Sequence, residues 1–212
     1  MRVFYLHGFG SSVKSSKAAF IASRLAGHGV SLETPDFNEP DFATLTVTRM
    51  VQQVCDRLDA RVEDPVALVG SSLGGFVAVQ TALARPDRVN RLVLLAPALD
   101  FAGNRMRDLA VHGLDEWRRT NRLEVFHHGY GRTMAVRYEL YTDALRYDAL
   151  NATLGLPIQV FQGRRDTAVD PDTVRRWAAA RPNVEFHELD DDHQLLSSLE
   201  HIWVEMRRFL GL

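Results

Sequence analysis

The possible chemistry of this chain centres on a serine set between glycines. Residues 70–74 read Gly-Ser-Ser-Leu-Gly, a Gly-x-Ser-x-Gly motif with Ser72 at its centre. The motif directly follows an apolar run at 65–69 and precedes a helix-like apolar run at 76–83. Strand, sharp turn and helix are the context in which this motif forms a nucleophile elbow, where the serine hydroxyl projects above a sheet. We therefore predict that Ser72 is a nucleophile; the alternative is a glycine-rich turn without chemistry.

A nucleophilic serine needs a base, usually a histidine, and an acid that orients that base. In a strand–elbow–helix architecture the acid and then the histidine follow the serine along the chain. Asp166 lies in the turn after the run at 158–161, and His193 follows the run at 184–187. We predict Asp166 as the acid and His193 as the base. Most other histidines, His127 among them, are expected to be surface or packing residues.

Both roles have rivals. Asp170 directly precedes Pro171 at the start of a predicted helix, which favours a role as the helix N-cap and leaves Asp166 as the acid. His187 is a weaker candidate for the base because it lies within a predicted strand. The aspartates at 190–192 indicate helix N-terminal anions or a solvated acidic turn. With one histidine they lack the clustered ligands of a zinc-type site, so we predict no metal.

The loop after the first predicted strand is expected to supply an oxyanion hole. A tetrahedral intermediate carries a negative oxygen that preorganised N–H groups stabilise. One N–H is expected from Leu73, the residue after the nucleophile, and the other from the loop after the first strand. That loop reads His-Gly-Phe-Gly-Ser-Ser at 7–12, and we predict the Phe9 N–H as the second donor. The alternative, a phosphate-binding turn, lacks its Gly-x-Gly-x-x-Gly or Gly-Lys-Ser/Thr pattern.

Composition is that of an ordinary globular protein. The chain has 212 residues, 46% hydrophobic and 25% charged, enough for a single domain with a substantial core. A net charge of −2 gives no reason to expect nucleic acid or an anionic membrane as partner. No apolar stretch approaches 18 residues and we see no signal peptide, so we expect no membrane span and a cytoplasmic enzyme. The one cysteine, Cys55, is expected to be buried.

Strands alternate with helices along most of the chain. Apolar runs predict strands at 2–6, 30–33, 66–69, 91–96, 157–161 and 184–187, with helices between them. This alternation implies a mainly parallel sheet of about six strands with helices packed on it, an α/β fold. Such sheets bind ligands beyond the carboxyl ends of their strands. His7, Ser72, Asp166 and His193 each come just after a predicted strand.

Residues 99–150 interrupt this alternation. The segment has no clear strand, is too long for a plain loop, and holds seven of the chain's 19 aromatic residues: Phe101, Trp117, Phe126, Tyr130, Tyr138, Tyr141 and Tyr147. We expect a small cap inserted between the fourth and fifth strands of one domain spanning residues 1–212. It could be a helical hairpin that covers a hydrophobic sheet edge or a lid that shapes an apolar pocket over Ser72, and the two are compatible.

Together these motifs resemble the α/β-hydrolase family. The resemblance rests on Tyr-Leu-His-Gly-Phe at 5–9, Gly-Ser-Ser-Leu-Gly-Gly at 70–75, Gly-Arg-Arg-Asp-Thr-Ala-Val at 163–169 and Asp-His at 192–193. The cap stretch from Trp117 to Asp148 is similar to small bacterial esterases and acyl-protein thioesterases. The resemblance implies a three-layer fold and hydrolysis without a metal or organic cofactor. The chain starts at what would be the family's third strand, so we expect a minimal, six-stranded version without the first two strands.

The expected function is a serine hydrolase that cleaves a small-molecule carboxylic ester or thioester through an acyl-enzyme intermediate. Ser72 would attack the acyl carbon, His193 would transfer the proton, and Asp166 would orient His193. The N–H groups of Phe9 and Leu73 would hold the oxyanion. The alternatives are an amidase, a carbon–carbon hydrolase, a perhydrolase, or a binding protein of this fold without catalysis. The sequence predicts neither the natural substrate nor the oligomeric state.

Overall fold

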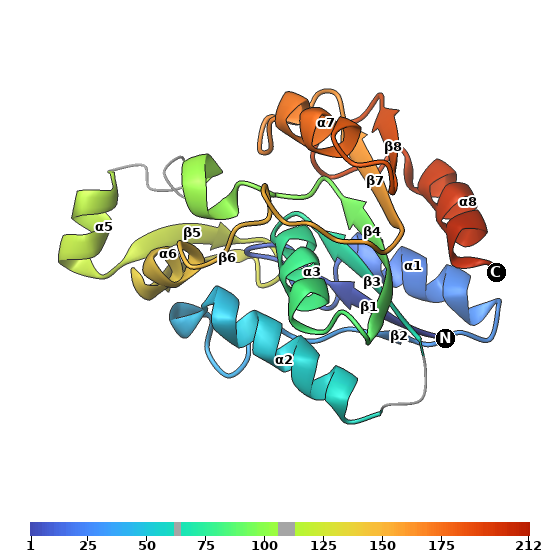
Figure 1. Cartoon of the computed structure of the whole chain (residues 1–212). Coiled ribbons are helices and arrows are strands. Elements are labelled where there is room, and N and C mark those ends of the chain that lie inside the picture. Colours follow the sequence, from blue (N-terminus) through green and yellow to red (C-terminus); the bar gives the residue numbers. More distant parts are fainter. Residues whose placement is uncertain (62–64, 106–112) are drawn as a thin grey trace.

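A six-stranded sheet forms the centre of the computed structural model, which describes residues 1–61, 65–105 and 113–212 (Figure 1). Neighbouring strands are all parallel and follow the order β2-β1-β3-β4-β7-β8. Their bounds are β1 (Arg2–Leu6), β2 (Leu32–Glu33), β3 (Val66–Ser71), β4 (Val89–Leu95), β7 (Ile158–Gly163) and β8 (Val184–Leu189). The predicted sheet is confirmed. Because the strand order reverses at β1 and β3, the ligand crevice of such a sheet is expected beyond these two strands.

Helices cover both faces of the sheet, which confirms the three-layer arrangement (Figure 1). Successive side chains of a strand point to opposite faces. Val3 and Tyr5 of β1 therefore pack with α1 (Ser16–Ala26) and α8 (Leu199–Leu210). Phe4 and Leu6 belong to the core on the other face, which is covered by α2 (Val47–Asp59), α3 (Leu73–Ala84) and α7 (Pro171–Ala179).

Two local predictions about these helices are confirmed. Asp170 caps α7, since its carboxylate accepts hydrogen bonds from the N–H groups of Asp172 and Thr173, both at 3.1 Å. Pro171 occupies the first turn, where an N–H group would have no acceptor within the helix, so the lack of one in proline costs no hydrogen bond. Cys55 is a buried thiol within α2.

The segment between β4 and β7 forms its own group at one side of the molecule (left in Figure 1). Its described residues form a short π-helical turn, two helices and a hairpin: η2 (Phe101–Arg105), α5 (Leu114–Thr120), β5 (Leu123–His127), β6 (Arg132–Val136) and α6 (Glu139–Ala144). A 3₁₀ turn, η1 (Phe42–Thr44), lies before α2 and contacts β6. Residues 106–112 of the predicted cap lie outside the described residues.

The prediction that residues 99–150 hold no strand is wrong. β5 and β6 pair as antiparallel strands, with Leu123 opposite Val136 and His127 opposite Arg132. Only the ends of β5 are buried, and the polar and exposed residues between them hide the period of two. Gly131, with φ of +65°, lies in the connecting turn, where a glycine adopts this backbone without strain.

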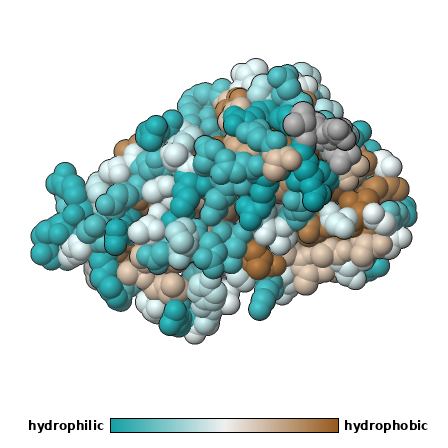
Figure 2. All heavy atoms as spheres, turned by 90° about the horizontal axis from the view of Figure 1, so that it is seen from below, coloured by the Kyte–Doolittle hydropathy of each residue, from teal (hydrophilic) through white to brown (hydrophobic). Residues whose placement is uncertain are grey.

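Few large hydrophobic side chains are highly exposed in the described residues: Leu83, Phe126, Tyr130, Leu145, Leu196 and Val204. Seen from below, the surface is mainly hydrophilic toward the end with α5, and hydrophobic residues gather toward the opposite end (Figure 2). In the described parts of the chain, no helix is both long and apolar enough to cross a membrane.

Candidate active site

Ser72 lies in the sharp turn between β3 and α3. Its backbone has φ 54° and ψ −117°, a strained conformation for a residue with a side chain. A Cβ placed on Gly70 would lie 2.4 Å from the carbonyl oxygen of Gly74, and one on Gly74 would lie 1.9 Å from that of Leu6. The glycines of the motif are therefore required because β3, α3 and β1 meet here backbone to backbone. The Ser72 N–H donates to the Leu95 carbonyl at 2.9 Å, which holds the turn in place.

His193 lies beside this serine, in the loop after β8. Its Nε2 is 3.1 Å from Ser72 Oγ, and its Nδ1 is 2.8 Å from Asp166 Oδ2. The structure thus brings together the three side chains that the sequence singled out, from positions up to 121 residues apart. His193 keeps 19% of its side-chain surface exposed, so it can meet a substrate, whereas the Asp166 side chain is fully buried.

Asp166 is held by four hydrogen bonds. Its Oδ1 accepts from the N–H groups of Ala168 and Val169, both at 2.8 Å, and its Oδ2 accepts from Gln162 Nε2 at 2.9 Å and from His193. Burial alone would raise the pKa of Asp166, but the bonds and charge of its partners outweigh burial and lower it.

An ionised Asp166 fixes the tautomer of His193. A carboxylate only accepts hydrogen bonds, so His193 Nδ1 carries a proton and donates it. Nε2 is then unprotonated and accepts the hydrogen bond from the Ser72 hydroxyl. This arrangement can withdraw a proton from Ser72 without any prior rearrangement.

The predicted oxyanion loop abuts the nucleophile. A Cβ placed on Gly8 would lie 3.3 Å from Ser72 Cβ and 3.9 Å from Ser72 Oγ. The loop turns back on itself, with the Ser11 N–H donating to the Gly8 carbonyl at 3.3 Å. Phe9 lies in this turn, and Leu73 is the first residue of α3, where N–H groups have no partner within the helix. The segments that carry the two predicted donors therefore lie beside Ser72.

The rival residues do not join this cluster. Asp170 caps α7, and His187 Nε2 is bound to Glu185 at 2.7 Å on β8. Within the described residues, one group could hold a metal ion by the spacing of its ligand atoms: Glu185, His187 and Glu205. Arg208 pairs with both carboxylates of that group and offsets part of its negative charge.

A cavity of about 820 Å³ opens at Ser72 and His193. Of the seven aromatic residues in the expected cap segment, only Phe101 lines this cavity. Trp117, Tyr138 and Tyr141 pack against one another and the core, where the Trp117 indole donates to the Val136 carbonyl at 3.1 Å. The packing of these three side chains fits the first expected role of the segment, the cover of a hydrophobic surface, while Phe101 contributes to the cavity. These side chains have enough apolar surface to be buried in the core, so the cavity is lined by smaller and more polar residues.

One wall of the cavity is polar and was not predicted. It is formed by the chain leading into α1 and comprises Ser11, Ser12, Lys14, Ser15, Ser16 and Lys17. Lys17 is 7% exposed and donates to the Gln194 carbonyl at 2.8 Å, next to His193. Burial lowers the pKa of Lys17 to about 8, although the charges of Asp192, Asp166 and Asp191 act to raise it. Lys14 and Lys17 are the only lysines among 25 basic residues, which could have served as a signal.

Asp190 and Asp192 are exposed, as expected of a solvated acidic turn, but Asp191 between them is not. Asp191 is 4% exposed, and its Oδ1 accepts from the Asp192 N–H at 2.8 Å. It is therefore part of the folded loop rather than a solvated turn. Since α8 begins only at Leu199, these aspartates are also not N-terminal anions of that helix.

Comparison with known proteins places the chain in a family. Residues 2–210 match the model of the uncharacterised protein family UPF0227. The chain is 36% identical over 114 residues to the lipase LipV of Mycobacterium tuberculosis, and this alignment covers 51% of this chain and 41% of that protein. It is 29% identical over 164 residues to the mitochondrial palmitoyl-protein thioesterase ABHD10 of Mus musculus, and this alignment covers 74% of this chain and 51% of that protein. The chain thus aligns with about half the length of these curated relatives or less.

Solved structures agree on the fold. Est1E from Butyrivibrio proteoclasticus, solved with ferulic acid, superposes with a TM-score of 0.84 at 18% identity, covering 98% of this chain and 87% of that one. Mouse alpha/beta hydrolase domain-containing protein 10 superposes with a TM-score of 0.82 at 21% identity, covering 99% and 89%. The chain therefore belongs to the protein family UPF0227 and has the α/β-hydrolase fold that its motifs predicted.

Proposed function

We infer that this protein is a serine hydrolase that cleaves small-molecule carboxylic esters or thioesters. The observation that carries the proposal is the unbroken hydrogen-bonded line from Ser72 through His193 to Asp166. The names of LipV, a lipase, and ABHD10, a palmitoyl-protein thioesterase, support ester hydrolysis as the reaction class. We include residues 99–150 in the same domain, as a cap insertion between β4 and β7.

In the proposed mechanism, Ser72 Oγ attacks the acyl carbon while His193 Nε2 takes the hydroxyl proton. Asp166 stabilises the imidazolium and keeps its orientation. The carbonyl oxygen becomes an anion and is stabilised by the N–H groups of Phe9 and Leu73. The imidazolium then protonates the leaving alcohol or thiol, which departs and leaves an acyl ester on Ser72. Water, deprotonated by His193, attacks this ester and releases the acid.

The lining of the cavity favours short or polar acyl groups. Phe9, Ala98 and Phe101 offer an apolar surface, but the serine and lysine wall of residues 11–17 faces the same space. A long alkyl chain would bury the polar groups of this wall without partners, at a cost of about 1–3 kcal/mol for each group left unsatisfied. We therefore expect turnover to be higher for acetyl and butyryl esters than for palmitoyl esters.

Esterase assays of Ser72→Ala test the proposal. Wild-type protein should hydrolyse p-nitrophenyl acetate and butyrate, and the variant should lose a factor on the order of 10⁴–10⁶ in kcat. Ser198→Ala is the control, because Ser198 precedes α8 and its hydroxyl makes no capping bond. Retention of wild-type turnover by Ser72→Ala would refute the assignment. Parallel assays with matched acyl thioesters would show which ester class is preferred.

A further inference from the structure

The turn of the β5–β6 hairpin lies directly on the loop that carries Phe9. We call residues 8–12 the oxyanion loop. The Gly129 N–H donates to the Gly10 carbonyl at 3.2 Å. A Cβ on Gly129 would lie 2.7 Å from Ser12 Cβ, and one on Gly10 would lie 3.2 Å from the Phe126 carbonyl oxygen. The hairpin and the oxyanion loop therefore contact each other without room for side chains between them.

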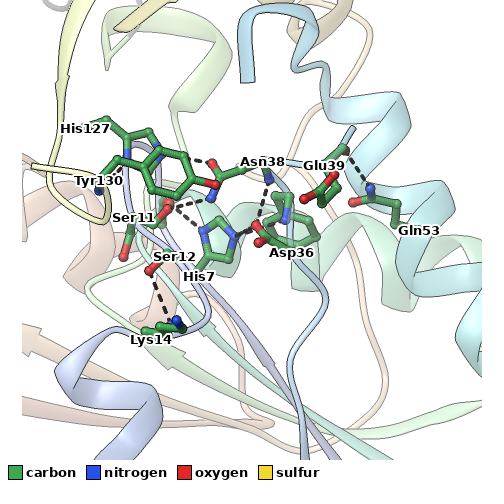
Figure 3. A network of polar contacts seen from close by, with 12 residues as sticks. His7, Ser11, Ser12, Lys14, Asp36, Asn38, Glu39, Gln53, His127 and Tyr130 are labelled. Atoms are coloured by element: carbon green, nitrogen blue, oxygen red, sulfur yellow. Dashed lines mark hydrogen bonds and ion pairs between the residues drawn. The ribbon is translucent and has the colours of Figure 1, made fainter. Parts of the chain in front are cut away.

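A buried chain of hydrogen bonds reinforces this contact (Figure 3). His127 Nε2 lies 3.0 Å from Asn38 Oδ1, and Asn38 Nδ2 donates to the Ser11 carbonyl at 3.0 Å. His127 is fully buried and Asn38 is 5% exposed. Hydrogen bonds in such a dry environment are strong when made and costly when broken. Three segments far apart in the sequence are thus joined at one point.

The direction of every bond in the chain is determined. The Tyr130 N–H donates to His127 Nδ1 at 3.2 Å, so Nδ1 is unprotonated and the proton resides on Nε2. His127 Nε2–H then donates to Asn38 Oδ1, which orients the Asn38 amide so that its NH₂ group meets the Ser11 carbonyl. Burial lowers the pKa of His127, in keeping with this neutral form. Tyr130 stacks on the imidazole at 4.2 Å between ring centroids.

Asn38 is itself held on a rigid support. The Phe37 N–H donates to His7 Nε2 at 3.0 Å, and Arg49 of α2 donates to the Phe37 carbonyl at 3.1 Å. The Asn38 N–H donates to Asp36 Oδ1 at 3.0 Å. The backbone at Asn38 is therefore anchored independently of the oxyanion loop, so Asn38 can define the position of the loop.

We propose that His127 and Asn38 are positioning residues that hold the oxyanion loop so that the Phe9 N–H points to the developing oxyanion. Within the loop itself the turn around Phe9 is closed by one bond, from Ser11 N–H to the Gly8 carbonyl. The carbonyls of Gly10 and Ser11 are fixed from outside, by the hairpin and by Asn38. The β5–β6 hairpin thereby contributes to transition-state stabilisation. This inference rests on the proposed serine-hydrolase function.

Variants at His127 and Asn38 test it through kcat. His127→Phe keeps a ring of similar shape but leaves Asn38 Oδ1 without a donor, and Asn38→Ala removes the link to Ser11. His127→Gln restores an N–H donor near the Nε2 position. A displaced oxyanion donor is expected to lower kcat by a factor on the order of 10–100, because complete loss of one such donor costs about 10²–10³. KM for p-nitrophenyl butyrate should change little, and His127→Gln should recover much of kcat.

Two measurements separate positioning from a loss of folding. Titration of reactive serine with a fluorophosphonate gives kcat per competent site, whatever fraction of the protein is folded. Affinity for a trifluoromethyl ketone, which forms an oxyanion on Ser72, should weaken in parallel with kcat. Asn183→Ala is the matched control. Like Asn38, Asn183 donates from its side-chain amide to backbone carbonyls, here those of Leu154 and Leu156, but it lies at the opposite edge of the sheet. It should lower the melting temperature and leave kcat per site unchanged.

Wild-type kcat per site in both His127→Phe and Asn38→Ala would overturn the inference, as would an equal loss in Asn183→Ala. The two proposals fail in different ways. If Ser72→Ala retains activity, the proposed function is wrong. If Ser72→Ala is inactive and the positioning variants are unaffected, only the role of the hairpin is wrong.

Discussion

Replacement of Asp166 by asparagine is expected to block catalysis by reversing the tautomer of His193. The Oδ1 position accepts two backbone N–H groups, from Ala168 and Val169, each at 2.8 Å. An amide at residue 166 would place its oxygen there, because an NH₂ group would leave both donors unpaired. Gln162, which donates to Oδ2, can turn its amide to accept from an NH₂ group instead, since its Oε1 has no partner. The NH₂ group would then occupy the Oδ2 position, 2.8 Å from His193 Nδ1.

This geometry sets the size of the effect. Facing an NH₂ donor, His193 Nδ1 must accept, so the proton moves to Nε2, where it confronts the Ser72 hydroxyl. His193 can then no longer take the proton of Ser72. Loss of the correct tautomer in a Ser-His-Asp site costs on the order of 10⁴ in kcat, equivalent to about 5.5 kcal/mol in the activation barrier.

Steady-state hydrolysis of p-nitrophenyl butyrate at neutral pH measures this loss. Asp170→Asn is the matched control, because it makes the same substitution four residues away. Asn caps helices about as well as Asp, so α7 and kcat should be unaffected. Near-wild-type kcat in Asp166→Asn, or a large loss in Asp170→Asn, would refute the reasoning.

Three further predictions concern stability. Lys17 has a pKa of about 8 in the folded protein and 10.5 in the unfolded chain, so the unfolded chain binds more protons between pH 8 and 10.5 and the free energy of unfolding rises with pH. Urea titrations should show a gain of up to roughly 3 kcal/mol over this range relative to Lys17→Met. Parallel pH profiles of the two proteins would contradict this. Gly74→Ala places a methyl group against the Leu6 carbonyl and should lower the free energy of unfolding by about 3 kcal/mol or more. An unchanged melting temperature would contradict the close approach of the two backbones. Trp117→Phe removes the buried hydrogen bond to the Val136 carbonyl and should cost about 1–3 kcal/mol with kcat retained. Equal denaturation midpoints would contradict a contribution of this bond.

The sheet and the positions of Ser72, Asp166 and His193 could be predicted because their signals are local. Each residue follows a short apolar run, and parallel strands bring their carboxyl ends to the same edge of a sheet. The Asp170 cap could also be predicted from the sequence, since an aspartate directly before a proline indicates a helix start. Such features require no knowledge of what packs against them.

The hairpin and the role of His127 could not be predicted because their reasons are not local. His127 has its side-chain partner 89 residues away, at Asn38, and in sequence it is one histidine beside another. β5 places the exposed Glu124 and Phe126 between buried ends, so its apolar pattern does not distinguish it from a loop. The packing of Trp117 into the core was likewise decided by tertiary contacts.

Covalent labelling of the reactive residue tests the central claim most directly. The folded wild-type protein is incubated with a fluorophosphonate, and the modified peptide is identified by mass spectrometry. We predict a single phosphonyl adduct on Ser72, because Ser72 lines the cavity and its Oγ lies 3.1 Å from His193 Nε2. An adduct on another residue, or none on the folded protein, would contradict the assignment of Ser72 as the nucleophile.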